Sequence, residues 1–140
     1  MTRLDPYGTQ TRREMQMPSQ ESRVDIVQAA RTNHAFRREV ITGIHEQVVL
    51  MTIPAGGEIG DEVHPDTDQV LVFVEGEAEA RLGEETIRVG ATDLVFVRGG
   101  TRHNFVNVGD RPLRLYTIYA PPHHPPGTIH LTKEEADAAE

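Results

Sequence analysis

The sequence contains no cysteine. This absence excludes disulfide bonds, thiolate catalysis, and zinc or iron–sulfur sites with cysteine ligands. Long apolar runs are missing as well: neither the ~7 to 15 apolar residues of a secretory signal nor the ~20 of a membrane span occur. Basic residues are in the minority, with 14 against 22 acidic ones and a formal net charge of -8. We therefore expect a cytoplasmic protein that binds neither a membrane nor nucleic acid.

The chain is long enough for one domain only. Two independent cores within 140 residues would each bury too little apolar surface, and the 9 Pro and 12 Gly spread along the chain exclude an all-helical bundle. Residues 1–22 are polar and lack periodicity, so we expect a flexible or partner-dependent tail there. The main domain is expected over residues 23–122, and a proline-rich segment with a short C-terminal helix over 123–140.

Two short helices are expected to flank a series of strands. Thr132 and Glu135 form a capping-box pair that predicts a helix through Ala138, and a weak helical spacing of apolar residues predicts one or two turns within 24–32. From residue 37 onward, short runs of Val, Ile, Leu and Phe are separated by turn residues, a pattern typical of an all-β sandwich or barrel. The connections are too short for crossover helices, so the strands must be antiparallel. The predicted strands span 39–42, 46–53, 60–64, 69–75, 77–82, 85–89, 93–97, 103–107 and 113–119.

Polar residues interrupt the strand pattern at two places. Glu62 and His64 are two positions apart, so they share one face of a strand, and Gln69 and His103 each open a later strand. If all four point into one barrel interior, their charge is costly unless a cation neutralises it, which predicts one divalent metal ion. Two histidines and a carboxylate suit Zn, Mn, Fe or Ni, with Gln69 as a weak fourth ligand or hydrogen-bond partner. The alternative is a buried hydrogen-bonded network without metal.

The spacing of these residues resembles the two motifs of the cupin superfamily, G(X)5HXH(X)4E(X)6G and G(X)5PXG(X)2H(X)3N. Every interval of the first motif is kept, but a glutamate stands in the first histidine position and a glutamine in the glutamate position; the matching residues are Gly56, Glu62, His64, Gln69 and Gly76. The second motif matches in its last three positions and departs in its first two, which here are Thr92 and Arg98; the matching residues are Gly100, His103 and Asn107.

The resemblance covers about residues 37–119 and is nearest to small single-domain bacterial cupins of the mannose-6-phosphate isomerase-like group. It implies a double-stranded β-helix, also called a cupin barrel or jelly roll, with a metal near the barrel mouth and frequently a homodimer. It implies no single reaction, because cupins include isomerases, dioxygenases, decarboxylases, lyases, epimerases and binding modules. Arg98 and Arg102 are the only candidates for a phosphate-binding cluster, which weakens the phosphoisomerase interpretation.

Three further residues are expected around the site. Phe73 and Phe105 share strand parity with Gln69 and His103, so they either wall the pocket or fill the core. Arg102 precedes His103 at the predicted mouth, where it steers an anionic substrate or is an ordinary exposed arginine.

The other aromatic and histidine residues carry weaker expectations. Tyr116 and Tyr119 are three positions apart and face opposite sides of a strand, so at most one lines the pocket. We interpret His123 and His124 as residues of a solvated or interface-packed loop rather than a second metal site. The remaining histidines have no partner at ligand spacing and are interpreted as surface residues; they are His34, His45 and His130.

The leading functional hypothesis is a metal-dependent enzyme of isomerase or lyase type that acts on a small sugar-like or keto-acid substrate. No catalytic residue is assigned, because the third ligand position lacks the free carboxylate that could serve as a general base. Two alternatives remain. One is an Fe(II)-dependent dioxygenase, favoured by the two-histidine, one-carboxylate ligand count. The other is a cupin that binds or senses a small molecule without catalysis.

Overall fold

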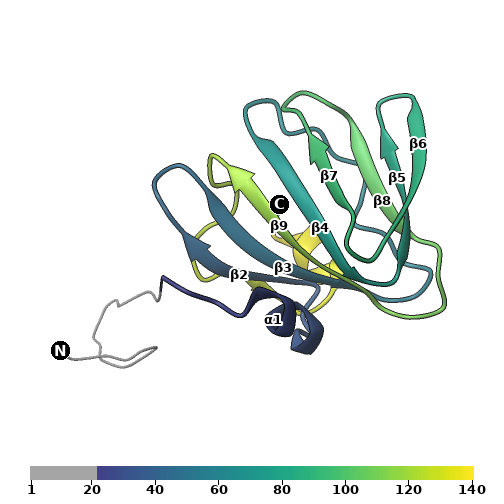
Figure 1. The fold of residues 1–140 in the computed structure, drawn as a ribbon. Helices are drawn as coiled ribbons and strands as arrows, with labels where there is room; N and C mark the ends of the chain where they lie inside the picture. Colours follow the sequence, from purple (N-terminus) through teal and green to yellow (C-terminus); the bar gives the residue numbers. More distant parts are fainter. Residues whose placement is uncertain (1–21) are drawn as a thin grey trace.

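Figure 1 shows the computed structural model, which describes residues 22–140. The expected tail over residues 1–22 therefore lies almost entirely outside the described residues. Two antiparallel sheets face one another, and buried side chains from both contribute to one hydrophobic core. The all-β double-stranded β-helix expected from the sequence is confirmed.

The larger sheet has six strands in the order β10-β2-β3-β9-β4-β7. Their bounds are Ile129–His130 for β10, Arg37–Thr42 for β2, Gln47–Ile53 for β3, Leu113–Ala120 for β9, Asp68–Glu75 for β4 and Leu94–Val97 for β7. The smaller sheet has the order β6-β5-β8, and its strands are Glu85–Gly90 for β6, Glu77–Leu82 for β5 and His103–Asn107 for β8.

Eight of the nine predicted strands are confirmed, with ends that differ by two residues or fewer. The predicted strand over 60–64 is wrong. Only isolated bridges join this part of the chain to β8, because Gly60 has a φ of 124° and donates its N–H to the Asn104 side chain instead of a strand partner. Glu62 and His103 nevertheless exchange both backbone hydrogen bonds at 2.9 Å, so the segment still runs alongside β8.

Both expected helices are present. Helix α1, Ile26–Thr32, is capped by Asp25, and helix α2, Lys133–Ala138, begins after Thr132. The Thr132 hydroxyl accepts the Glu135 N–H at 3.1 Å, as the capping box predicts. A capping box also has a second hydrogen bond, from the backbone N–H of the N-cap residue to the Glu side chain. Here the Glu135 carboxylate accepts the N–H of Leu131 instead of that of Thr132. Neither helix has the length or apolar character needed to cross a bilayer.

The inner face of the larger sheet changes from apolar to polar along its length. Alternate residues of each strand point inward, so cross-strand partners form rows on this face. On β3, β9 and β4 one row is apolar and consists of Met51, Leu115 and Phe73. Two rows away, the partners are Gln47, Tyr119 and Gln69, all buried. Buried polar side chains at one end of a barrel need partners, which makes that end the candidate site.

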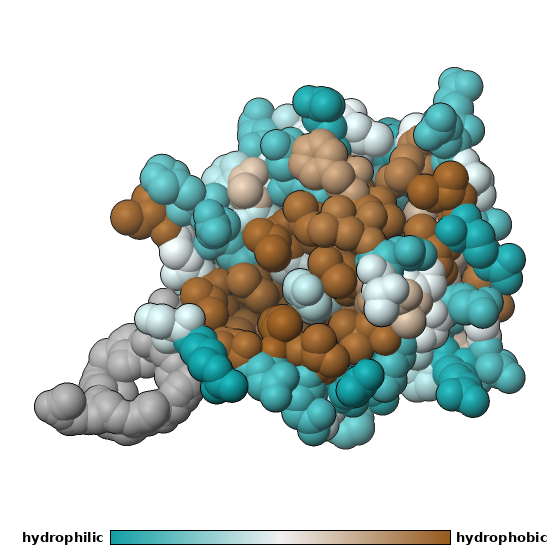
Figure 2. Space-filling model, in the orientation of Figure 1, coloured by the Kyte–Doolittle hydropathy of each residue, from teal (hydrophilic) through white to brown (hydrophobic). Residues whose placement is uncertain are grey.

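The outward face of the same sheet is also hydrophobic. Figure 2 shows an extensive apolar area across it, and Leu94 and Phe96 on the edge strand β7 are 61% and 47% exposed. The homodimer expected from the resemblance stays a prediction.

Candidate metal centre

Glu62, His64 and His103 come together at the polar end of the barrel. Each offers one ligand atom, and these atoms all lie within 4.8 Å of one another. The Nε2 nitrogen of His64 lies 3.2 Å from Oε1 of Glu62, and the rings of His64 and His103 are 5.2 Å apart. Within residues 22–140 this is the one such group of histidine and acidic side chains. The structure thus brings together the three residues that the sequence predicted as the main ligands.

The backbone around His103 prepares its ring for a metal. Its Nδ1 atom lies 2.8 Å from the carbonyl oxygen of Thr101, which can only accept a hydrogen bond. Nδ1 therefore carries the proton, and the lone pair of Nε2 is free. His64 also directs a buried nitrogen to this point: the polar contact of its Nε2 atom is with Oε1 of Glu62, at 3.2 Å.

The charge states also suit a cation. Burial on its own would raise the pKa of Glu62, but the neighbouring His64, Arg37 and His103 outweigh it and hold that pKa below its usual value. Burial lowers the pKa of His103, although its bond to Thr101 opposes the shift. A carboxylate that stays ionised and an imidazole that stays neutral are the forms that bind metals.

Gln69 supplies a fourth oxygen whose orientation can be deduced. The Thr117 hydroxyl donates its single proton to the Val70 carbonyl at 2.8 Å. It must therefore accept from Gln69, whose Nε2 lies 3.0 Å away, and this fixes the amide nitrogen on that side. The opposite amide atom, Oε1, is buried without any partner. An orphaned buried oxygen fits a cation or a ligand donor, so the donor set as a whole fits a metal ion.

Thr117→Val is expected to weaken metal binding by about 10- to 100-fold, because it removes the contact that fixes the Gln69 amide. Threonine and valine have nearly the same shape, so the change deletes two hydrogen bonds without leaving a cavity. Isothermal titration calorimetry with Zn²⁺ measures the dissociation constant in the variant and in the wild type. The matched control is Thr86→Val on the exposed face of β6, which should bind metal as the wild type does. Equal affinities in the two variants would contradict this role of Thr117.

A histidine from the C-terminal segment also reaches the site. The His123 ring lies 4.2 Å from that of His64 and stacks on Tyr119 at 5.6 Å. Gln47 holds this segment in place: its Oε1 accepts the N–H groups of His123 and His124, and its Nε2 donates to the His124 carbonyl at 2.6 Å. His123 is exposed, as expected for a residue of a solvated loop, but Gln47 holds its segment so that the His123 ring lies against that of His64.

The folded protein should become less stable as the pH is lowered, because burial keeps several of these imidazole rings neutral. Burial lowers the pKa of His103, of His123 and, to about 3, of His124. The unfolded chain takes up protons on these rings below about pH 6.5 while the folded chain does not, so folding is favoured above that pH and is weakened as pH falls. Each neutral ring contributes at most about 1.4 kcal/mol per pH unit, and less where water reaches it.

We expect the free energy of unfolding of the metal-free protein, measured by urea denaturation, to decrease between about pH 6.5 and 4. His124→Asn should make this dependence shallower. A stability that stays level over this range, or an unchanged slope in the variant, would contradict the prediction.

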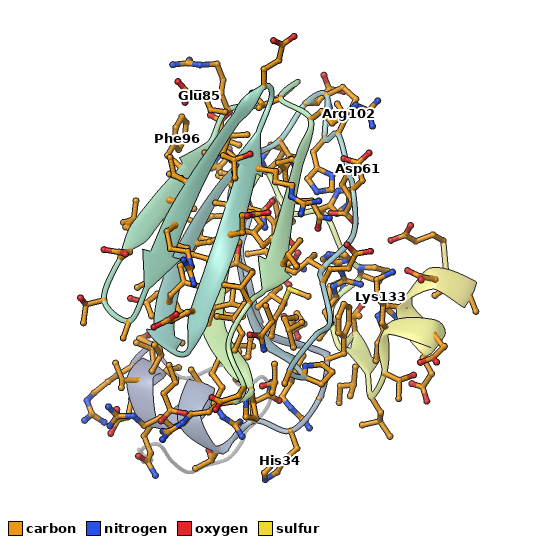
Figure 3. The ribbon with its side chains drawn as sticks, turned by 90° about the vertical axis from the view of Figure 1, so that its right-hand side faces the viewer. His34, Asp61, Glu85, Phe96, Arg102 and Lys133 are labelled. Carbon is orange, nitrogen blue, oxygen red and sulfur yellow. The ribbon has the colours of Figure 1, made fainter. Side chains whose placement is uncertain are left out.

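The expected pocket residues occupy different places. Phe73 and Phe105 are fully buried with ring centroids 5.8 Å apart, and Phe105 lies 6.2 Å from the His103 ring. Both belong to the hydrophobic core, and Phe105 also forms a floor beneath the site. Arg102 is exposed and forms an ion pair with Asp61 at 2.8 Å, and the two side chains lie close together in Figure 3. Its charge is thereby largely compensated.

Other residues of interest lie as follows. Of the two tyrosines, Tyr119 faces inward and its ring is 6.0 Å from that of His64, whereas Tyr116 lies on the other face of β9. His34 and His45 are exposed, as expected. His130 is half-buried on the edge strand β10, and its Nδ1 atom lies 3.4 Å from Nη1 of the buried Arg37.

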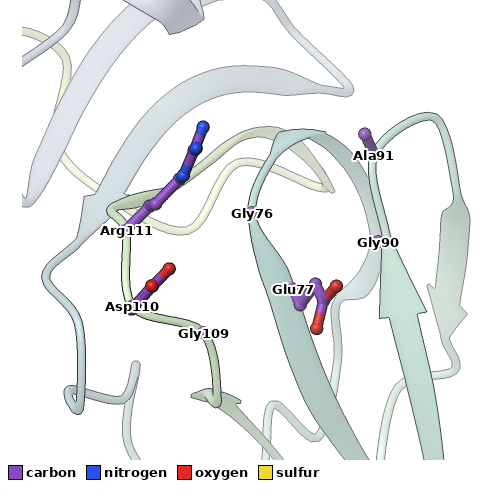
Figure 4. Close-up of a pocket in the computed structure, with 7 residues that line it drawn as sticks. All are labelled: Gly76, Glu77, Gly90, Ala91, Gly109, Asp110 and Arg111. Atoms are coloured by element: carbon purple, nitrogen blue, oxygen red, sulfur yellow. The ribbon is translucent and has the colours of Figure 1, made fainter.

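A second hollow lies at the opposite end of β5 and β8. Figure 4 shows it between the turns at Gly76 and Gly90 and the loop of Gly109, Asp110 and Arg111. It contains no histidine and no group of metal ligands, so it is separate from the metal centre.

Comparison with known proteins agrees with this geometry. Residues 49–119 match the Cupin domain family. The chain is 42% identical over 123 residues to the uncharacterized protein YrkC of Bacillus subtilis, which covers 84% of this chain and 66% of that protein. It is 33% identical over 117 residues to the uncharacterized protein L612 of Acanthamoeba polyphaga mimivirus, covering 81% of this chain and 73% of that one.

Among solved structures, the crystal structure of BH2720 from Bacillus halodurans superposes with a TM-score of 0.84 at 41% identity, covering 87% of this chain and 97% of that chain. None of these three names states an activity, so the mannose-6-phosphate isomerase-like subgroup stays a prediction. The family match, the relatives and the arrangement of Glu62, His64 and His103 agree: the chain belongs to the cupin domain family.

Proposed function

We propose that this cupin binds one divalent metal ion through Glu62, His64 and His103, with Gln69 as the fourth oxygen donor, and acts on a small oxygenated molecule held beside it. The observation that carries the proposal is the convergence of three ligand atoms within 4.8 Å next to the orphaned oxygen of Gln69. A bound metal would supply Lewis-acid polarisation of a carbonyl or hydroxyl group. Zn, Mn, Fe and Ni all suit these donors.

The residues beside the ligands suit the binding of a small polar molecule, and an enzyme of isomerase or lyase type is the leading candidate. Gln69 is locked by Thr117, so its oxygen can orient a bound group without rotating away. His123 and Tyr119 border the ligands, and Phe105 closes the site from below. A site closed on its apolar side and bordered by polar rings is suited to one small polar molecule.

Elemental analysis of protein purified without chelator tests the proposal. We expect about one metal ion per chain after supplementation, and a rise in melting temperature with the metal that binds best. Less than about 0.1 metal ion per chain would overturn it.

A second candidate is an Fe(II)-dependent dioxygenase, favoured by the ligand set of two histidines and one carboxylate. Oxygen uptake by protein reconstituted with Fe(II) under anaerobic conditions, tested on a panel of diketones, separates it from the first candidate. If metal binds but no substrate panel gives turnover, the remaining candidate is a cupin that binds or senses a small molecule.

A further inference from the structure

Arg37 is a buried charge without a counterion. It opens β2, faces inward opposite Met51, and is 2% exposed. Among residues 22–140 it is the one fully buried side chain with a permanent charge, and none of the ion pairs formed within this part of the chain includes it. Burying an arginine in this way is costly unless an anion accompanies it.

The polar neighbours of Arg37 leave part of its guanidinium group unpaired. Its Nε atom is buried without a partner, and its Nη1 atom has only the Nδ1 atom of His130, at the long distance of 3.4 Å. The Tyr119 hydroxyl lies close enough to Arg37 for the two to interact, and burial raises the pKa of Tyr119, so this phenol keeps its proton. The Nε2 atom of His124 is also buried without a partner. None of these groups is an anion, so none of them offsets the charge of Arg37.

This cluster borders the metal centre. The Tyr119 ring is 6.0 Å from that of His64, and the field of Arg37 extends to Glu62, whose pKa it helps to lower. With a divalent ion bound, Glu62 cancels one of its two charges and Arg37 adds another, which leaves this end of the barrel at about +2. An anionic ligand would compensate that charge, whereas a neutral sugar would not. This step rests on the proposed metal site.

We propose that Arg37 and Tyr119 form an anion subsite beside the metal centre, and that the ligand is a small carboxylic acid with a neighbouring oxygen, such as a 2-oxo or 2-hydroxy acid. The planar guanidinium matches the two oxygens of a carboxylate, and the second oxygen function reaches the metal side of the pocket. Of the two substrate classes expected from the sequence, sugar-like compounds and keto acids, an anion subsite favours the acids.

Calorimetric titration of metal-loaded protein with lactate and with lactamide, its neutral counterpart, tests the subsite. We expect lactate to bind at least about tenfold more tightly than lactamide. Arg37→Met should abolish this preference, and Arg37→Lys should keep part of it, because it retains the charge but not the planar fork. Arg38→Met is the matched control: Arg38 is the next residue, its Nε donates to Asn33, and the preference should be unchanged.

Melting temperature gives an independent readout. Without ligand, Arg37→Met should melt at the same or a higher temperature than the wild type, because it removes an uncompensated buried charge. A lower melting temperature together with unchanged lactate preference would show a purely structural role and overturn the proposal. Equal binding of lactate and lactamide, or tighter Arg37-dependent binding of inorganic phosphate than of lactate, would also overturn it.

Metal content, measured in every sample, separates this proposal from the proposed function. If the wild type binds no metal, the proposed function fails, and the subsite is tested in the metal-free protein by thermal shift with acetate against acetamide. If acetate but not acetamide raises the melting temperature, and Arg37→Met loses this effect, the subsite is supported. If the two compounds change the melting temperature equally, the subsite is overturned.

Discussion

His103→Ala is expected to abolish metal binding, with a loss of affinity of more than about 100-fold. The variant removes one of three ligands, and the one whose free nitrogen is fixed by the Thr101 carbonyl. The remaining Glu62 and His64 lie 3.2 Å apart and, with the Gln69 amide oxygen, keep only one nitrogen donor. Elemental analysis after dialysis against the preferred metal measures the loss, and circular dichroism checks that the sheets are intact.

The control for this prediction is His45→Ala, which removes an exposed histidine that does not belong to the ligand cluster. It should retain the metal content of the wild type. If His103→Ala also kept a full complement of metal, the ion would have to be held elsewhere, and the assignment of the metal centre would be wrong.

Phe73→Ala is expected to destabilise the protein by about 3 to 5 kcal/mol. Phe73 is fully buried, lies opposite Leu115 in the apolar row of the larger sheet, and packs against Phe105 from the smaller sheet. Its removal leaves a cavity where the two sheets meet, which the surrounding backbone can fill only in part. The free energy of unfolding in urea measures the cost.

The matched control is the same substitution on a neighbouring strand. Phe96 on β7 is 47% exposed and lies on the outward face, so Phe96→Ala should cost less than about 1 kcal/mol. A similar decrease in the free energy of unfolding in the two variants would contradict the placement of Phe73 at the centre of the core.

The fold could be predicted because alternation and turn residues act locally. In β9, every second residue from Leu113 to Tyr119 is buried while the residues that alternate with them are more exposed, and this period of two is visible in the sequence. The segment 60–64 failed for a local reason as well. Glu62 and His64 are spaced as residues on one face of a strand, but the positive φ of Gly60 and its hydrogen bond to the Asn104 side chain interrupt the pairing. The spacing of residues gives no sign of this competition between side chain and backbone.

The metal ligands could be predicted because motif spacing places Glu62 and His64 in a segment that runs alongside β8, the strand that carries His103. Their partners could not, because they come from distant parts of the chain. His123 reaches the ligands only through the contact of its segment with Gln47, 76 residues earlier, and Arg37 meets His130 across 93 residues. A weak signal did exist: Arg37, Gln47 and Thr117 are polar residues at positions where the strand alternation points inward, and each has a partner in the structure.

The two-residue strand β10 has a consequence for how the protein behaves among other copies of itself. Together with its flanks it covers the outer edge of β2, where Phe36 donates its N–H to Leu131 and Glu39 donates to Thr128. An uncovered strand edge is a template for pairing with another chain, which is how many β proteins form aggregates. Residues 128–131 thus protect this edge of the larger sheet from pairing with another chain. A variant truncated so that it ends before Thr128 would expose a row of unpaired backbone N–H groups on β2.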